Sequence, residues 1–148
     1  MAHWNEDSLV EQPSIELFQA LGYSYQNCYN EIFGEKGTLG RETSTDVILI
    51  PKLREALLNL NPDIPIEAIE QAVEELTRDR SVLNPVNANR EIYKLIRDGV
   101  KIKVKREDGT EEDETVKVIE FDNPDRNDFF LASQFWIAGD YGKKRADL

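Results

Sequence analysis

The hydrophobic periodicity of the chain changes at Gly99, and this change limits the folds that the chain can adopt. Before Gly99, apolar residues recur every three or four positions, which is the spacing of one face of a helix. After it, Val100 and Ile102 alternate with lysines, which is the pattern of a half-exposed strand. A chain of 148 residues is long enough to bury a core of its own. We therefore expect an α+β fold in which a helical part, about residues 8–98, precedes a β part, about residues 100–148.

The helical part should contain N-terminal and central helices. Helical spacing covers about residues 8–21, 44–60, 65–77 and 87–98. Proline removes a backbone donor, so Pro13 should kink the first helix or mark its true start. For the same reason, we expect Pro51 to bend the second helix.

The β part should be an antiparallel β-meander. The strand that begins at Val100 turns at Asp108-Gly109 and should return over about 115–121. The apolar run from Phe129 to Ile137 predicts a buried strand. The pattern over Lys144 to Leu148 is that of a strand that has only just started. Because the chain ends inside this element, we expect it to be a truncated fragment.

The charge balance excludes DNA binding through the overall electrostatic field. There are 18 Lys plus Arg against 29 Asp plus Glu, and the formal net charge is −11. Contact with nucleic acid would therefore need a local site or a partner. The acidic residues between 107 and 114 are expected at the solvated tip of the hairpin, because nothing fixes their carboxylates around one metal ion.

Several classes of protein are excluded by what the sequence lacks. The one cysteine, Cys28, allows no intrachain disulfide, and with the single histidine, His3, it cannot build a conventional zinc site. We expect Cys28 to be buried filler. Neither of the glycine-rich nucleotide-binding motifs is present. No apolar run approaches the roughly 20 residues of a membrane span, so we expect a cytoplasmic protein without membrane contact.

The order of short motifs resembles the N-terminal region of the type I restriction enzyme R subunit. The matching stretches are Arg41-Glu42-Thr43-Ser44, Leu53-Arg54-Glu55-Ala56-Leu57, Leu60-Asn61-Pro62-Asp63-Ile64-Pro65, Asn89-Arg90-Glu91, Leu95, Gly99-Val100, Arg106-Glu107-Asp108-Gly109, Phe121-Asp122-Asn123-Pro124, Asn127-Asp128-Phe129, Gln134-Phe135 and Arg145-Ala146-Asp147-Leu148. A helix that carries Val10-Glu11 and closes on Leu21-Gly22-Tyr23 also looks similar. The resemblance covers nearly the whole chain.

This resemblance implies an ATP-driven translocase and endonuclease with a magnesium-dependent PD-(D/E)xK centre. Residues 145–148 resemble the stretch that opens this motif, although Ala146 stands where the family usually has proline. The second carboxylate and the lysine, E-x-K, would follow Leu148, and the ATP-binding motor domain would lie further on. Residues 1–148 would thus be the N-terminal part of an endonuclease domain, with an incomplete nuclease-like core. The implied partners are DNA and the methyltransferase and specificity subunits of the restriction-modification system.

The resemblance also selects candidate site residues. Asp147 is the candidate catalytic residue and magnesium ligand, because phosphodiester hydrolysis uses a hard cation that carboxylates hold. Glu11 matches the acidic residue that many nucleases of this type carry on their first helix, near the metal. Lys143, Lys144 and Arg145 form the compact basic run that would meet a DNA phosphate.

Plainer interpretations remain open for each residue and for the chain. Asp147 and Glu11 are also explained as solvated surface acids, and the basic run as an exposed turn. Gln134, which matches a family glutamine, would either satisfy backbone donors or contact substrate. The chain would alternatively be a non-catalytic docking module for restriction-modification subunits, with its surface supplied by residues 41–99. An acidic DNA mimic is the least favoured alternative, because lysines and arginines interrupt its acidic segments.

Overall fold

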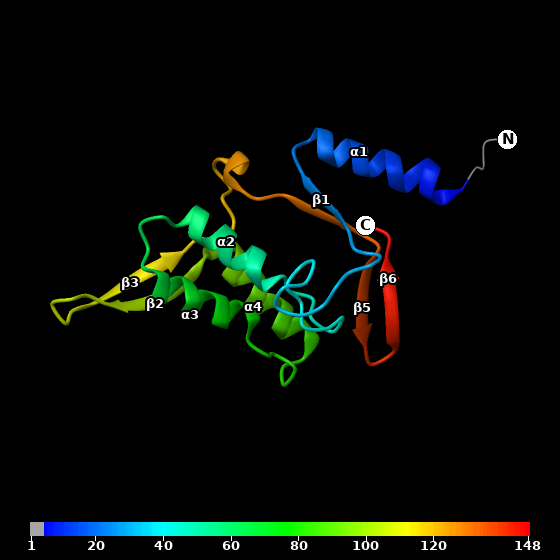
Figure 1. Cartoon of the computed structure of the whole chain (residues 1–148). Coiled ribbons are helices and arrows are strands. Elements are labelled where there is room, and N and C mark those ends of the chain that lie inside the picture. The colour runs from blue at the N-terminus through cyan, green and yellow to red at the C-terminus, as the bar shows by residue number, and fades with distance from the viewer. Residues whose placement is uncertain (1–4) are drawn as a thin grey trace. The chain divides into compact units, whose positions relative to one another are not determined.

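A computed structural model describes residues 5–148 of the chain. The chain forms two compact units (Figure 1). The terminal unit combines the chain up to Leu49 with Asp128–Leu148, and the central unit is Ile50–Asn127. Both units contain helix and strand, so the expected α+β class is confirmed. No helix within residues 5–148 is long and apolar enough to cross a membrane.

The terminal unit contains one helical segment and two pairs of strands. Its elements are a π-helical turn η1 (Asp7–Glu11), helix α1 (Gln12–Ala20), and the strands β1 (Ser24–Asn27), β4 (Phe130–Ser133), β5 (Phe135–Gly139) and β6 (Gly142–Ala146). Strand β5 pairs antiparallel with β6, and Figure 1 shows the two side by side as a hairpin. Strand β1 pairs in parallel with β4, a pairing between the two ends of the chain that the sequence did not predict.

Pro13 lies in the first turn of α1, and the π-helical turn η1 runs directly into this turn, so the helical segment begins before Pro13. The missing backbone donor of the proline falls at the junction of the two turns, where the N–H of Gln12 bonds five residues back, to the carbonyl oxygen of Asp7. The helix ends at Ala20 with Leu21 as its C-cap residue, and Gly22 follows with φ of 95°, a left-handed conformation that glycine adopts without steric cost. The predicted C-terminal stop of this helix is therefore confirmed.

The central unit contains most of the helical residues. Its elements are α2 (Ile50–Leu60), α3 (Ile66–Thr77), α4 (Pro85–Asp98), β2 (Val100–Lys105), β3 (Glu111–Val116) and a 3-10 turn η2 (Pro124–Arg126). The predicted helix over 44–60 was wrong in its first part, because residues 44–49 are not helical. Pro51 is the second residue of α2, so it begins this helix instead of bending it.

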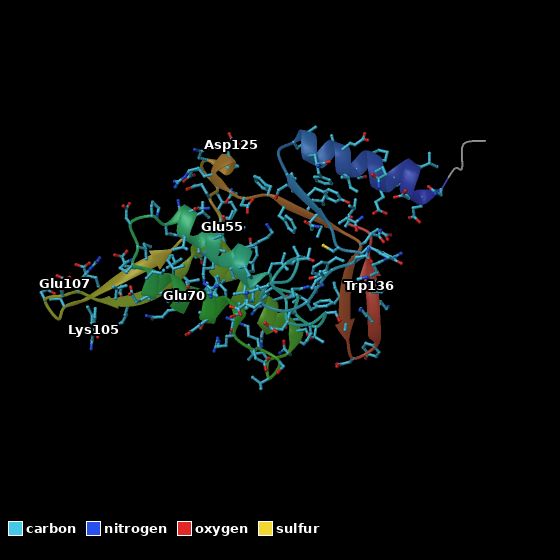
Figure 2. All side chains as sticks on the ribbon, in the orientation of Figure 1. Glu55, Glu70, Lys105, Glu107, Asp125 and Trp136 are labelled. Carbon is cyan, nitrogen blue, oxygen red and sulfur yellow. The ribbon has the colours of Figure 1, made fainter. Side chains whose placement is uncertain are left out.

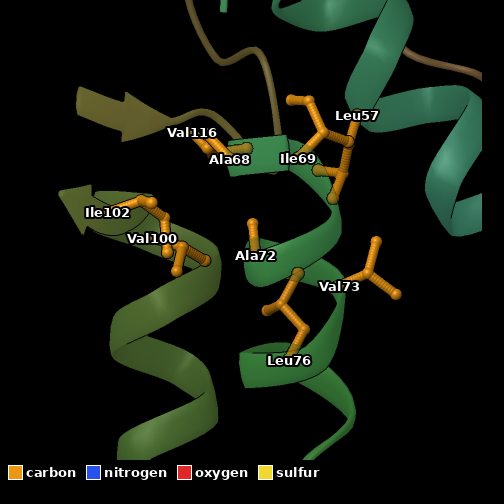
Figure 3. Packing of buried hydrophobic residues seen from close by; sticks show 9 residues of the cluster. All are labelled: Leu57, Ala68, Ile69, Ala72, Val73, Leu76, Val100, Ile102 and Val116. Carbon is orange, nitrogen blue, oxygen red and sulfur yellow. The ribbon is translucent and has the colours of Figure 1, made fainter. Parts of the chain in front are cut away.

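One face of α3 forms the core of the central unit (Figure 3). The buried members of this core are Leu57, Ala68, Ile69, Ala72, Val73, Leu76, Val100, Ile102 and Val116. They come from α2, α3 and the β2–β3 hairpin, so the helical stripe and the alternating strand that the sequence predicted meet in one cluster.

The β2–β3 hairpin returns earlier than predicted, because β3 spans Glu111–Val116 rather than 115–121. The acids from 111 to 114 therefore lie within a strand and not at the tip. Two of them lie opposite lysines of β2: Lys103 pairs with Asp113, and Lys105 with Glu111. Opposite charges directly across a strand pair are stabilising, which accounts for their place in the sheet.

The predicted continuous strand over 129–137 is interrupted at Gln134. Gln134 has φ of 55°, so the extended backbone of β4 ends there and β5 starts in a new direction. Most residues of both strands are only partly buried, contrary to the prediction of a buried strand. Strand β6 starts at Gly142, two residues before the predicted Lys144, and ends at Ala146.

Gly99 provides a test of the central unit. Its φ is 82°, and an added Cβ would lie 2.7 Å from Cγ2 of Thr115 and 2.9 Å from the carbonyl oxygen of Val116. Gly109 has nearly the same φ, 83°, with nothing within 4 Å, so Gly109→Ala measures the left-handed backbone cost alone. We expect Gly99→Ala to lower the free energy of unfolding by about 1–3 kcal/mol more than Gly109→Ala does, because it adds an overlap. Urea denaturation measures both, and equal losses would contradict the predicted close approach.

Candidate active site

An open pocket of about 420 Å³ in the terminal unit gathers residues from both ends of the chain. Its lining includes Asp7 and Glu11 of η1, Tyr29 after β1, Gln134 between β4 and β5, and Arg145 and Asp147 at the end of β6. The pocket thus combines several carboxylates with one guanidinium. Both predicted catalytic residues, Glu11 and Asp147, line it.

Gln134 connects the two predicted acids. Its side-chain amide Nε2 donates to both carboxylate oxygens of Glu11, at 2.8 and 3.0 Å. Its backbone N–H donates to the carbonyl oxygen of Asp147, at 3.2 Å. Its left-handed backbone is uncommon for a residue with a side chain, and such conformations cluster at functional sites. The sequence left two roles open for Gln134, and the structure adds a third: the Gln134 side chain orients the carboxylate of Glu11.

Burial and attachment differ between Glu11 and Asp147. Glu11 is partly buried at the last position of η1, and its carboxylate is held by Gln134. Asp147 is exposed and follows directly after β6. The backbone bond from Gln134 fixes the main chain at Asp147, while its carboxylate stays open to solvent. Their roles in catalysis stay predictions.

The predicted basic run does not form one patch. Successive side chains of a strand point to opposite faces. Lys143 and Arg145 are paired in register with Ala138 and Trp136, so they share the face that carries Trp136. Lys144 lies on the opposite face, and of the three basic residues only Arg145 lines the pocket.

Arg41 attaches the segment between β1 and α2 to strand β5, a role that the sequence did not predict. The side chains of Arg41 and Glu31 are both 0% exposed and form a two-pronged ion pair, with Nε to Oε1 at 2.9 Å and Nη2 to Oε2. Arg41 Nη1 also donates to the carbonyl oxygen of Asp46 at 2.8 Å, and Nη2 to that of Trp136 at 3.0 Å. The guanidinium carbon lies 3.9 Å from the centroid of the Phe135 ring. In the sequence, Arg41 belonged only to a family-like motif, which gave no sign of a buried charge.

Cys28 is buried, as predicted, and it forms no disulfide. Burial raises the pKa of the Cys28 thiol above its usual value; the nearby charge of Glu31 raises it further, and that of Arg41 opposes the change. The thiol is therefore protonated at neutral pH, a state in which it is a poor nucleophile. His3, the single histidine of the chain, lies outside the described residues.

The carboxylates of the pocket are the ligands that a magnesium ion prefers. Mg²⁺ is held in proteins by one or two carboxylates together with water and substrate oxygens. Within residues 5–148 no group of three or more Asp, Glu, His or Cys side chains is arranged to hold a metal ion. Glu11 and Asp147 therefore offer the type of donor atom that magnesium prefers, and a complete site would need further ligands.

The buried ion pair of Arg41 and Glu31 generates a stability prediction. Arg41→Met would leave the Glu31 carboxylate buried without a partner, so we expect the free energy of unfolding to fall by about 3–5 kcal/mol. Adding Glu31→Leu removes that uncompensated charge, and the double variant should recover much of the loss. Denaturant unfolding of both variants measures the difference. A double variant no more stable than Arg41→Met would show that the bonds to Asp46 and Trp136 matter more than the charge of Glu31.

Comparison with known proteins places the chain in one family. The family model described as type I restriction enzyme R protein N terminus matches residues 3–148. The type I restriction enzyme HindI endonuclease subunit of Haemophilus influenzae is 29% identical over 92% of this chain and 13% of its own length. The putative type I restriction enzyme MjaIXP endonuclease subunit of Methanocaldococcus jannaschii is 33% identical, again over 92% of this chain and 13% of its own length.

This chain therefore spans only about 13% of the length of these curated relatives. No solved structure is a significant match. The family model covers almost every residue, including η1, the Gln134 junction and the end of β6, which together form the pocket. The chain belongs to the family of type I restriction enzyme R protein N-terminal regions.

Proposed function

We propose that this chain supplies the first half of a magnesium-dependent nuclease centre in a type I restriction R subunit that cuts foreign DNA. Asp147 and Glu11 would be its catalytic carboxylates, and Asp147 its first metal ligand. One observation carries this proposal. Glu11 and Asp147 come from opposite ends of the chain, yet they line the same pocket, and Gln134 bonds to both residues.

The bonding within the pocket suits such a role. A bound Mg²⁺ would activate a water molecule and offset negative charge on the phosphate. The exposed carboxylate of Asp147 leaves its oxygens available to a hard cation. Each oxygen of Glu11 accepts one bond from Gln134, and a carboxylate oxygen can accept a second contact. Gln134 would therefore orient Glu11 without occupying all of its acceptor positions.

The remaining parts of the centre would lie in the rest of the subunit. By resemblance to the family, those parts are the E-x-K carboxylate and lysine and the ATP-driven translocase, so this chain itself would bind no ATP. The methyltransferase and specificity subunits would assemble with the complete R subunit on DNA. These 148 residues would lack the E-x-K carboxylate and lysine and the motor domain, so we expect the chain alone not to cleave DNA, with or without Mg²⁺ and ATP.

A non-catalytic docking module is the second candidate function. Apolar side chains stand exposed within residues 41–99: Val82 is 93% exposed, and Val86 and Tyr93 are 66% and 62% exposed. Val86 and Tyr93 lie two helical turns apart on α4, so they share one face of this helix. An exposed apolar surface of this kind is typical of protein contacts and does not involve the pocket.

Asp147→Ala in the complete R subunit, assembled with its partner subunits, tests the nuclease proposal. We expect plasmid cleavage to be abolished, while ATP hydrolysis, translocation and assembly stay nearly intact, because a separate motor domain handles ATP. Loss of a metal-binding carboxylate commonly costs several kcal/mol of transition-state stabilisation, and about 1.4 kcal/mol is tenfold in rate. Asp147→Asn should fail nearly as badly, because an amide oxygen is a poorer magnesium ligand.

Asp140→Asn provides the matched control for this test. Asp140 is also exposed and lies in the β5–β6 turn, outside the pocket lining, so we expect near-normal cleavage. Glu11→Ala should give a smaller defect than Asp147→Ala. Cleavage at normal speed by Asp147→Ala would show that the catalytic assignment is wrong. Loss of both cleavage and ATP hydrolysis would show that Asp147 is structural.

A further inference from the structure

The positive charges of the terminal unit are few, and most of them lie on one strand. Its basic residues are Lys36, Arg41, Lys143, Lys144 and Arg145, against eleven acidic residues. Arg41 is buried and paired with Glu31, so it is not available to a ligand. Strand β6 therefore carries most of the exposed positive charge of an otherwise acidic unit, and its side chains would attract an anion.

Two of the β6 cations, Lys143 and Arg145, lie over aromatic rings. We name these residues the cationic pair, and the rings beneath them, Trp136 and Tyr29, the aromatic floor. The Lys143 Nζ lies 4.8 Å from the Trp136 ring centroid. The guanidinium carbon of Arg145 lies 5.4 Å from the Trp136 ring and 5.2 Å from the Tyr29 ring. Figure 2 labels Trp136, which lies on β5. The indole N–H of Trp136 donates to the carbonyl oxygen of Tyr29 at 3.3 Å.

The aromatic floor positions these cations without neutralising them. A cation–π contact restricts a flexible side chain, yet it uses none of the N–H donors that a carboxylate would use. Within residues 5–148, neither the Lys143 nor the Arg145 side chain forms an ion pair or hydrogen bond that would satisfy those donors. Acidic residues are abundant in this unit, yet these two exposed cations contact aromatic rings and not carboxylates. Their N–H donors therefore stay available to an external anion.

Lys144 differs from its two neighbours. It is paired with Ile137 in register, so it lies on the opposite face of the hairpin, away from Trp136. It carries the same charge as Lys143 and is one residue away, yet it lacks the aromatic floor. The sequence placed all three basic residues in one group, and the register separates them.

We propose that the cationic pair binds phosphates of the DNA backbone beside the pocket of Glu11 and Asp147, and that Lys144 does not. This inference rests on the proposed function, because it takes DNA as the ligand. Arg145 lines the pocket itself, so a phosphate bound by its guanidinium would lie next to the two acids. A guanidinium binds a phosphate through two parallel hydrogen bonds, and an ammonium contributes a point charge to a neighbouring phosphate.

Salt-dependent DNA binding by the 148-residue chain, measured without magnesium, tests this proposal. A short fluorescently labelled DNA duplex is titrated with the chain at several low salt concentrations, and binding is followed by anisotropy. A phosphate contact adds about 1 to the slope of log affinity against log salt. We expect Lys143→Gln and Arg145→Gln each to weaken binding several-fold and to reduce this slope by about 1. Lys144→Gln and Lys36→Gln make the same charge change and should have less than half of that effect.

Variants of the aromatic floor separate positioning from charge. Tyr29→Leu and Trp136→Leu leave the net charge unchanged, so a purely electrostatic attraction would not respond to them. We expect each to weaken duplex binding several-fold, because Arg145 loses a ring that holds it. Circular dichroism checks that each variant is folded. If Trp136→Leu is unfolded, the binding result for Tyr29→Leu decides the test by itself. In the unsubstituted chain, the indole N–H resonance of Trp136, assigned with Trp136→Phe, should shift when the duplex is added.

Several outcomes would overturn the proposal. One is equal weakening by the glutamine variants at Lys143, Lys144 and Arg145, which indicates a diffuse field. Another is the absence of duplex binding at the lowest salt. A third is binding of poly-glutamate as tight as that of the duplex. This test involves no cleavage, so a failure of the Asp147 assignment would leave its result unchanged, and a failure here would leave the Asp147 assignment untouched.

Discussion

The terminal unit depends on a buried charge pair between Arg41 and Glu31. Both side chains are fully removed from solvent, which is tolerated only where every charged group is bonded. Arg41 meets this requirement by donating to Glu31 and to the carbonyl oxygens of Asp46 and Trp136, and by lying over Phe135. No buried side-chain polar atom within the described part of the chain lacks a partner. Together with the backbone bond from Ala138 to Ser44, Arg41 attaches the segment after β1 to the β5–β6 hairpin.

The candidate site follows from that attachment and from two features around it. Parallel pairing of β1 with β4 brings Tyr29 near the end of the chain, and the left-handed backbone of Gln134 starts β5 in a new direction. The same turn directs the Gln134 amide to Glu11 and its backbone N–H to Asp147. The pocket is therefore assembled from long-range contacts, and no single segment contains it. An acidic pocket beside a cationic strand is a suitable arrangement for a phosphodiester substrate, which needs both a metal ion and phosphate contacts.

Much of the central unit could be predicted from the sequence because its elements are set by local periodicity. The predicted helices over 65–77 and 87–98 correspond to α3 and α4 within two residues, and the strand after Gly99 corresponds to β2. The errors arose where two local signals compete. Residues 44–49 continue the apolar spacing of α2, but a helix through them would place Pro51 in its interior, where its ring clashes with the preceding turn. Likewise, the acids of β3 resemble a turn until their pairing with the lysines of β2 is known.

The α+β class, the main helices and the burial of Cys28 could be predicted from the sequence, and resemblance to a family selected Glu11 and Asp147, whose catalytic roles stay predictions. These follow from periodicity, composition and short motifs, all of which are properties of neighbouring residues. Three features could be seen only in the folded chain: Gln134 joins Glu11 to Asp147, Arg41 is buried, and Lys144 faces away from Lys143 and Arg145. Each depends on contacts between distant segments or on strand register, and a shift of one residue in register would exchange the two faces of β6.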